Sequence, residues 1–269
     1  MTDRKKPKSY QALVCKKGVC SSVSLDLIGE EPLMIRVEDK AYSVVMRSPG
    51  QEVFHAAGFC MGEGIVDSAD DFASIGYDEM QDPNLVDVWL KPERRKEVRD
   101  ILKRRGFVSQ TSCGICGKEL IEDLAQKLTP VESDFEIDFD SARECLEQLD
   151  KQQRYYQTTR ASHAALILDE RAQPLSFAED VGRHNALDKA VGAALMDGKL
   201  SAGRIVVLSS RNSYELVQKA ARARLPVMIS NSRPTGLAVE MGKSLDMTLL
   251  FAGGSDLIVV CGESRIKGA

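Results

Sequence analysis

The sequence predicts an α/β fold, α+β overall, with a layered C-terminal α/β domain and a smaller N-terminal α+β domain. Two observations lead to this prediction. In the second half of the chain, short apolar runs typical of buried strands alternate with amphipathic helices. In the first half, a strand hairpin and a further strand are interspersed with two helices. Because 269 residues can bury one large core or two modest ones, the domains are expected over residues 1–117 and 118–269.

Composition narrows the class of protein. The chain is 43% hydrophobic and 28% charged, which is ordinary for a globular enzyme, and its formal net charge of −4 argues against nucleic-acid binding. No apolar run is long enough to span a bilayer, and residues 1–9 lack the apolar stretch of a signal peptide. Seven cysteines, an odd number, favour a reducing cytoplasm over a disulfide framework. We therefore expect a cytoplasmic protein with neither a nucleic-acid nor a membrane partner.

The N-terminal half is expected to contain a hairpin, a further strand and two helices. A polar turn at 38–40 joins two runs rich in Val, Ile and Met, and Pro92 and Gly106 mark the start and the stop of a very basic helix. Its basic run is most simply a solvated face, with a landing surface for an acidic partner or a cofactor as the alternative. The expected elements are strands 32–37, 41–46 and 86–90 and helices 51–61 and 92–105.

Cys113 and Cys116 form a Cys-x-x-Cys pair in an expected loop that also contains Gly106, Gly114 and Gly117. Two thiols at this spacing can hold a metal, cycle as a disulfide or carry sulfur as a persulfide. A structural zinc site normally needs four ligands, and the other five cysteines and the three histidines are scattered along the chain. The residues alone leave reactive sulfur chemistry and metal binding both open.

The C-terminal half alternates regularly. A helix at 120–128, an acidic connector at 132–140 and a long polar helix at 141–157 come first. Apolar runs and helical periodicity then alternate to the end of the chain, which is typical of a layered sheet. The expected elements are strands 163–168, 204–209, 226–230, 247–251 and 257–261 and helices 185–196, 214–223 and 234–243.

Three polar loops, 179–185, 209–213 and 230–236, each follow an expected strand and open a helix. The carboxyl ends of parallel strands line one crevice, where helix N-termini, guanidinium groups and hydroxyls bind phosphate. The alternative is that these residues only cap helices. Together the loops indicate a large anionic ligand, with the candidate residues Gly182, Arg183, His184, Ser210, Arg211, Ser232 and Thr235. His163, which opens a strand, is either a structural histidine or part of this site.

Ordered motifs along most of the chain resemble the formate dehydrogenase accessory sulfurtransferases. The most specific is the run from Glu179 to Lys189, because a lone Cys-x-x-Cys is weak evidence. The matching segments are Glu31–Val37, Met46–Gly50, Gly58–Ile65, Cys113–Gly117, Ser162–Ala165, Glu179–Lys189, Ser209–Lys219 and Leu237–Glu240.

The resemblance implies a sulfur carrier that formate dehydrogenase requires. Cys113 would accept sulfur from a cysteine desulfurase as a persulfide, with Cys116 assisting relay or release. The sulfur would pass to the molybdenum (or tungsten) bis(molybdopterin guanine dinucleotide) cofactor, bound as a substrate, before its insertion into formate dehydrogenase. No tightly bound metal of the protein's own is expected.

The resemblance also implies a C-terminal domain similar to the cytidine deaminase fold, a homodimer and a cofactor-binding segment. That segment comprises Ala252, Gly253, Gly254, Ser255, Asp256 and Leu257. It lacks the basic residues usual in the family, for which backbone N–H groups of the two glycines could compensate. The family often has glycine at the position of Arg160.

Other functions remain to be weighed. A non-enzymatic cofactor chaperone, with a structural or metal-binding Cys pair, stays open. A zinc hydrolase needs His-x-Glu followed downstream by Pro-Cys-x-x-Cys, whereas Ala164 and Ala165 follow His163 and the Cys pair lies upstream. A thioredoxin-type oxidoreductase is disfavoured, because the pair does not lie between the first strand and helix of a βαβ unit.

Overall fold

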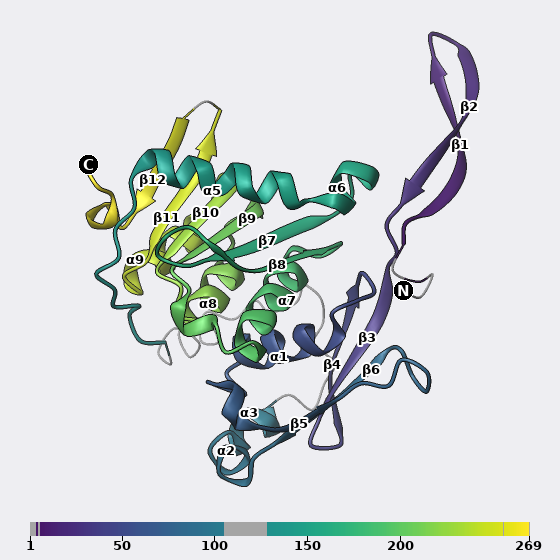
Figure 1. Ribbon diagram of the computed structural model, residues 1–269. Helices are drawn as coiled ribbons and strands as arrows, with labels where there is room; N and C mark the ends of the chain where they lie inside the picture. Colours follow the sequence, from purple (N-terminus) through teal and green to yellow (C-terminus); the bar gives the residue numbers. More distant parts are fainter. Residues whose placement is uncertain (1–3, 5, 105–127, 255, 269) are drawn as a thin grey trace.

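The computed structural model describes residues 4, 6–104, 128–254 and 256–268, and these form a mixed α/β molecule. From the top of Figure 1 downwards lie helix α5 (Phe139–Gln152), a six-stranded sheet, helices α7 (Arg183–Met196) and α8 (Tyr214–Arg222), helix α1 (Glu52–Gly62) and a four-stranded sheet. The expected mixed α/β fold class is confirmed. The expected domain boundary after residue 117 lies outside the described residues.

The four-stranded sheet has the order β4-β3-β6-β5, formed by β3 (Glu31–Val37), β4 (Lys40–Arg47), β5 (Phe72–Gly76) and β6 (Leu85–Leu90). The expected hairpin is present, and its turn places Glu38 and Asp39 at positive φ. The strand β5 was not predicted. The single basic helix expected over 92–105 is two short helices, α2 (Pro92–Glu97) and α3 (Arg99–Arg104), because the chain leaves helical geometry at Val98.

The six-stranded sheet has the order β12-β11-β10-β9-β7-β8. Its strands are β7 (His163–Leu168), β8 (Pro174–Asp180), β9 (Ile205–Arg211), β10 (Val227–Ser232), β11 (Thr248–Gly253) and β12 (Asp256–Cys261). The strands β9, β10 and β11 are parallel, while β7 and β12 run antiparallel to their neighbours. Because β8 is antiparallel to β7, it runs in the direction of β9.

Both faces of the central strands β7, β9, β10 and β11 are buried, which explains why these strands appear in the sequence as continuous apolar runs. Successive side chains point to opposite faces. Ala165 and Ile167 therefore join the core beneath α7 and α8, whereas Leu166 and Leu168 pack under α5. The helix expected over 141–157 breaks at Gln153 into α5 and α6 (Arg154–Thr159), and α9 (Gly236–Ser244) follows β10 as expected.

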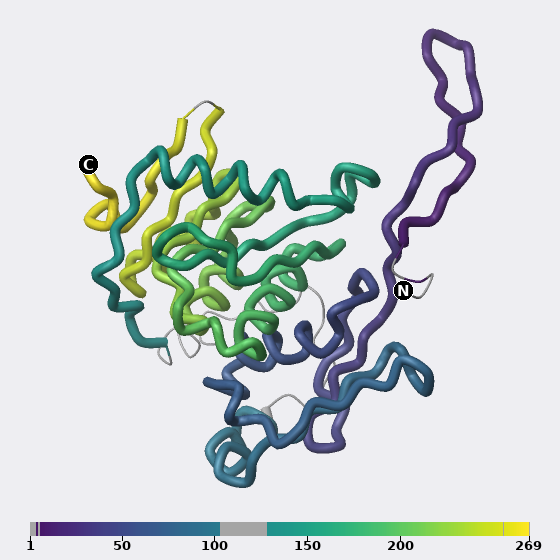
Figure 2. The backbone as a smooth tube through the Cα atoms, in the orientation of Figure 1, coloured from purple at the N-terminus to yellow at the C-terminus, as the bar shows by residue number. Residues whose placement is uncertain are grey.

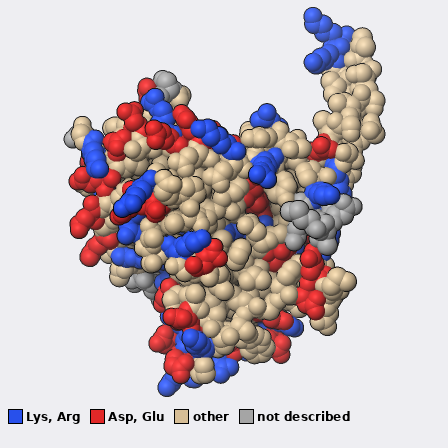
Figure 3. Space-filling view, in the orientation of Figure 1, with Lys and Arg blue, Asp and Glu red and all other residues tan. Residues whose placement is uncertain are grey.

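An N-terminal arm, β1 (Lys8–Lys16) paired with β2 (Val19–Leu27), projects from the body of the molecule and was not predicted (Figure 2). The strand register places Cys15 opposite Cys20, and a disulfide joins them, which the sequence analysis did not foresee. One face of the arm is apolar; in Figure 3 most of the arm is uncharged and its tip is blue. Among the described residues, no helix is both long and apolar enough to span a membrane.

Arg160 ends α6 in the left-handed region, with φ of 57°. Glycine adopts this conformation without strain, whereas a side chain crowds the backbone. The position is therefore one that glycine would occupy without strain. The guanidinium of Arg160 lies over the ring of Tyr156, 5.2 Å from its centroid.

Helices α1 and α7 cross in backbone contact, and this contact joins the two sheets. A Cβ atom on Gly58 would lie 1.8 Å from the carbonyl oxygen of Asp188, and one on Gly192 would lie 1.8 Å from that of Phe54. No side chain fits in either place. The apolar core is consequently continuous from the four-stranded sheet, through α1 and α7, to the six-stranded sheet.

We predict that Gly58→Ala destabilises the protein by at least about 3 kcal/mol, because the two helices must separate to admit the methyl group. Urea unfolding followed by circular dichroism measures the change. Gly236→Ala is the matched control, since a Cβ there would meet no atom within 4 Å. Equal stability of the two variants would contradict the close crossing.

Candidate functional site

One edge of the six-stranded sheet collects the polar loops expected from the sequence. The strands β8, β9, β10 and β11 run in one direction, so their carboxyl ends meet at the same edge as the amino ends of β7 and β12. Four strand spacings separate β8 from β11, or about 19 Å along this edge. The expectation that the strand-end loops lie together is met by this arrangement.

The described candidate residues all lie along this edge. His163 opens β7, and Gly182, Arg183 and His184 lie between β8 and the first turn of α7. The others are Ser210 and Arg211 at the end of β9, Ser232 and Thr235 around the end of β10, Ala252 and Gly253 at the end of β11, Gly254 in the following turn, and Asp256 and Leu257 at the start of β12. Ser255 lies outside the described residues, as do Cys113 and Cys116.

Unpartnered polar atoms are buried at this edge. Asn212 is fully buried between β9 and α8, and neither atom of its amide has a hydrogen-bond partner among the described residues. The same holds for the buried Oγ of Ser213, the hydroxyl of Tyr214 and the Nε of Arg183. Buried polar groups in native proteins are nearly always paired, so these donors and acceptors indicate a bound ligand or ordered water. Asn212, Ser213 and Tyr214 were not among the predicted site residues, although they belong to or adjoin the polar run at 209–213.

A buried carboxylate holds the loop between β8 and α7. Asp180 is fully buried and accepts hydrogen bonds from the backbone N–H groups of Ser48 (3.0 Å) and Gly182 (2.8 Å) and from the amide of Asn185 (2.9 Å). The Nζ of Lys189 lies 2.6 Å from the same carboxylate. Burial lowers the pKa of Lys189, and the charge of Asp180 opposes that effect. Two of the motifs noted in the sequence, Met46–Gly50 and Glu179–Lys189, are thus direct contact partners.

Further contacts extend this joint between the two sheets. Lys189 donates to the carbonyl of Ser48 (2.8 Å), Asn185 donates to that of Met46 (2.7 Å), and Val181 N–H donates to the hydroxyl of Ser48 (3.0 Å). A Cβ on Gly182 would lie 2.7 Å from the amide nitrogen of Asn185, so the turn requires glycine at position 182. The turn that presents Arg183 and His184 is therefore rigid.

The two histidines of the edge differ in environment. Burial, followed by the nearby charges of Arg183 and His184, holds the pKa of His163 below its usual value, so its imidazole is neutral at neutral pH. His184 places its Nε2 atom 2.7 Å from a carboxylate oxygen of Glu215. That contact lowers the pKa of Glu215, which therefore stays ionised. Among the described residues, no group of three or more His, Cys, Asp or Glu side chains is placed to hold a metal ion.

Among the described cysteines, none is available as a nucleophile. Cys15 and Cys20 form the disulfide of the arm. Cys60, Cys145 and Cys261 are buried, and burial raises the pKa of all three thiols, that of Cys145 to about 12. Because the thiolate is the reactive form, these three thiols are inert. The assignment of Cys60 and Cys261 to the core is confirmed.

Comparison with known proteins gives the family. The model of the FdhD/NarQ family matches residues 28–267. A protein of Streptomyces avermitilis named "Sulfur carrier protein FdhD" is 35% identical over 262 residues, which covers 93% of this chain and 92% of that protein. A protein of the same name from Anaeromyxobacter dehalogenans is 34% identical over 250 residues, covering 88% of this chain and 87% of the other.

A solved structure has the same fold. The crystal structure of a protein from Desulfotalea psychrophila, described as a candidate formate dehydrogenase accessory protein, superposes with a TM-score of 0.78. The match covers 97% of this chain and 99% of that chain, at 20% sequence identity. Both sheets and the helices between them therefore belong to an arrangement that is already known.

We predict that Lys189→Met destabilises the protein by about 3–5 kcal/mol, because it leaves the carboxylate of Asp180 buried without its counter-charge. Urea unfolding measures the loss. The double variant Asp180→Asn/Lys189→Met removes both charges and should recover part of the stability. A loss below about 1 kcal/mol in the single variant would show that the pair does not hold the joint together.

Proposed function

The chain belongs to the FdhD/NarQ family, and on that premise we propose that it is a sulfur carrier required for formate dehydrogenase activity. It receives sulfur as a persulfide on Cys113 and transfers that sulfur to a molybdenum (or tungsten) bis(molybdopterin guanine dinucleotide) cofactor before the cofactor enters the dehydrogenase. The observation that carries the proposal is the state of the other cysteines. Cys60, Cys145 and Cys261 are buried, and Cys15 and Cys20 lie on the N-terminal arm, which projects away from both sheets, so Cys113 and Cys116 are the thiols that fit the proposed role.

Loading is a nucleophilic displacement. The thiolate of Cys113 attacks the outer sulfur of the persulfide on the active-site cysteine of a desulfurase. A new S–S bond forms on Cys113, the donor's S–S bond breaks, and its electron pair leaves with the donor's cysteine as a thiolate. No external oxidant or reductant takes part in this step.

Release needs two electrons, because the sulfane sulfur of a persulfide leaves as hydrosulfide. The thiolate of Cys116 supplies them when it attacks the inner sulfur of the Cys113 persulfide. The attack forms a Cys113–Cys116 disulfide and expels hydrosulfide. The hydrosulfide would replace an oxo ligand of the bound metal, and the oxygen would leave as water after taking the proton of the hydrosulfide and one proton from solvent. A cellular dithiol then reduces the disulfide, which prepares the pair for another cycle.

The sheet edge is the proposed binding site of the cofactor's guanine dinucleotide. Its length of about 19 Å is comparable with that of an extended dinucleotide. The helices α7, α8 and α9 begin there and direct backbone N–H groups towards it, while Arg183 and Arg211 supply positive charge for the pyrophosphates. The unpartnered amide of Asn212 offers both a donor and an acceptor to the ligand.

Other parts of the proposal rest on the family resemblance. They are a cysteine desulfurase and formate dehydrogenase as partners, a cytoplasmic location, a homodimer, a cytidine deaminase-like C-terminal domain and a role for the turn at 252–257 in cofactor binding. In that turn Gly254 has φ of 83°, and Gly253 and Gly254 are exposed, so their backbone is open to a ligand. The alternative function is a cofactor chaperone that carries no sulfur.

We predict that incubation with a cysteine desulfurase and free cysteine adds sulfur to Cys113, as a mass gain that reductant removes. Peptide mass spectrometry measures it. Cys113→Ala should acquire no sulfur, whereas Cys116→Ala should load Cys113 but release no hydrosulfide. Cys261→Ala is the control, since that thiol is buried. Tightly bound zinc in place of sulfur would favour the chaperone with a metal-binding pair.

We also predict that the wild-type protein binds GDP and that Arg183→Ala weakens binding on the order of tenfold, the effect of one lost charged hydrogen bond. Calorimetric titration measures both affinities. Arg171→Ala is the matched control, because Arg171 lies in the turn between β7 and β8 at the opposite end of the strands. An unchanged GDP affinity in Arg183→Ala would show that the nucleotide binds elsewhere.

A further inference from the structure

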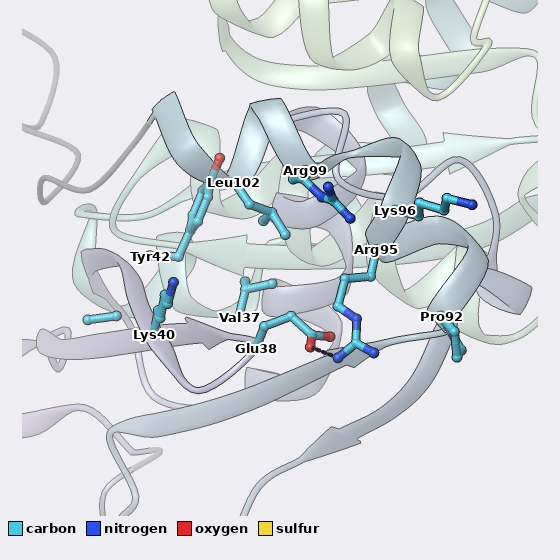
Figure 4. A pocket seen from close by; sticks show the side chains of 10 residues that line it. Val37, Glu38, Lys40, Tyr42, Pro92, Arg95, Lys96, Arg99 and Leu102 are labelled. Carbon is cyan, nitrogen blue, oxygen red and sulfur yellow. Dashed lines mark hydrogen bonds and ion pairs between the residues drawn. The ribbon is translucent and has the colours of Figure 1, made fainter.

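A pocket of about 700 Å³ lies on the side of the molecule that carries the four-stranded sheet (Figure 4). It opens between the β3–β4 hairpin and the helices α2 and α3. Its lining residues are Val37, Glu38, Lys40, Ala41 and Tyr42 from the hairpin and Pro92, Arg95, Lys96, Arg99 and Leu102 from the helical side. None of them takes part in the sheet edge or in the joint around Asp180.

The lining is cationic and largely uncompensated. The single carboxylate, Glu38, is already engaged, since it accepts from the backbone N–H of Leu90 (2.8 Å) and meets Arg95 NH1 at 2.8 Å. Within the described part of the chain, Lys40, Lys96 and Arg99 have no ion pair, and all three are exposed. Three unpaired cations around one pocket, in a protein of formal net charge −4, form a local site for an anion.

The floor of the pocket is apolar. Val37 and Tyr42 are buried, and the ring of Tyr42 packs edge-to-face against Phe59 of α1, with 6.0 Å between centroids. Leu102 closes the helical side. A simple inorganic anion would leave this floor unused, whereas a peptide with an apolar side chain flanked by Asp or Glu would fill both parts.

The position of the pocket connects it with sulfur loading. The helix α3 ends at Arg104, and Cys113 follows nine residues later in the sequence, a length of chain that can span at most about 32 Å. The strand β4 runs from the pocket, at Lys40, to the joint, at Arg47, over about 23 Å. A protein docked in the pocket therefore has Cys113 within reach and leaves the cofactor edge free.

We propose that this pocket is the docking site for an acidic segment of the sulfur-donating protein. The inference rests on the proposed function and extends it to the donor. The basic helices then act as an electrostatic landing surface, and the apolar floor fixes the register of the bound segment. Association through exposed charges of opposite sign is fast and weakens with ionic strength.

The test compares loading of Cys113 from two donors in the full-length protein with Lys96→Glu/Arg99→Glu. With a cysteine desulfurase and cysteine, the apparent second-order rate should fall about tenfold or more at low salt, and the difference should shrink at high salt. With glutathione persulfide, which needs no docking, the rate should be unchanged. Lys151→Glu/Arg171→Glu is the control, because it makes the same change of charge at two exposed positions in α5 and in the β7–β8 turn.

The outcomes separate the two proposals. The docking site would be overturned if Lys96→Glu/Arg99→Glu accepted sulfur from the desulfurase at the wild-type rate. It would also be overturned if the control variant lost as much of the loading rate. A loss with both donors would also overturn it, because the defect would then lie in the thiol. Calorimetric binding of the desulfurase supplies an independent reading. If the desulfurase binds the wild-type protein but not the variant, and transfers no sulfur to the wild-type protein, the docking site would be supported and the proposed function overturned.

Discussion

The backbone contact between α1 and α7 is the constraint on which the rest of the structure depends. Gly58 and Gly192 let the two helices approach until each backbone touches the other, and one apolar core then spans both sheets. The same approach brings the end of β4 over the turn that follows β8. Ser48 and Asp180, which are 132 residues apart in the sequence, form a hydrogen bond only because these helices cross so closely.

The polar joint that results makes one side of the molecule rigid. Buried charges are costly unless they are paired and hydrogen-bonded, and Asp180 and Lys189 satisfy each other and four neighbouring groups. The turn from Gly182 to His184 is consequently held in place before any ligand arrives, which lowers the entropic cost of binding at the sheet edge. The pocket beside α2 and α3 lies at the other end of β4. A carrier that must meet two partners is expected to keep the two binding surfaces apart.

Sequence reasoning predicted what depends on local pattern. Five strands of the larger sheet were predicted from their apolar runs, whereas β8 was not, because its sequence mixes polar and apolar residues. The clustering of polar loops followed from the direction of parallel strands. The N-terminal arm was missed although its residues alternate around Lys16, Lys17 and Gly18, because a hairpin whose residues are almost all exposed gives no core signal. The breaks at Val98 and Gln153 were missed because neither residue is a helix breaker. The hydrogen-bond partners of Asp180 and the unpaired amide of buried Asn212 depend on tertiary contacts, which no local sequence pattern predicts.

The most direct test of the account follows one sulfur atom from the protein to the cofactor. Cys113 is loaded with ³⁴S from labelled cysteine, freed of donor, and mixed with the bis(molybdopterin guanine dinucleotide) cofactor in a single turnover. We predict that the label leaves Cys113, appears as a sulfido ligand of the metal, and leaves a Cys113–Cys116 disulfide behind. Label that stays on the protein, while unlabelled cofactor still activates formate dehydrogenase, would contradict sulfur transfer and identify the protein as a cofactor chaperone.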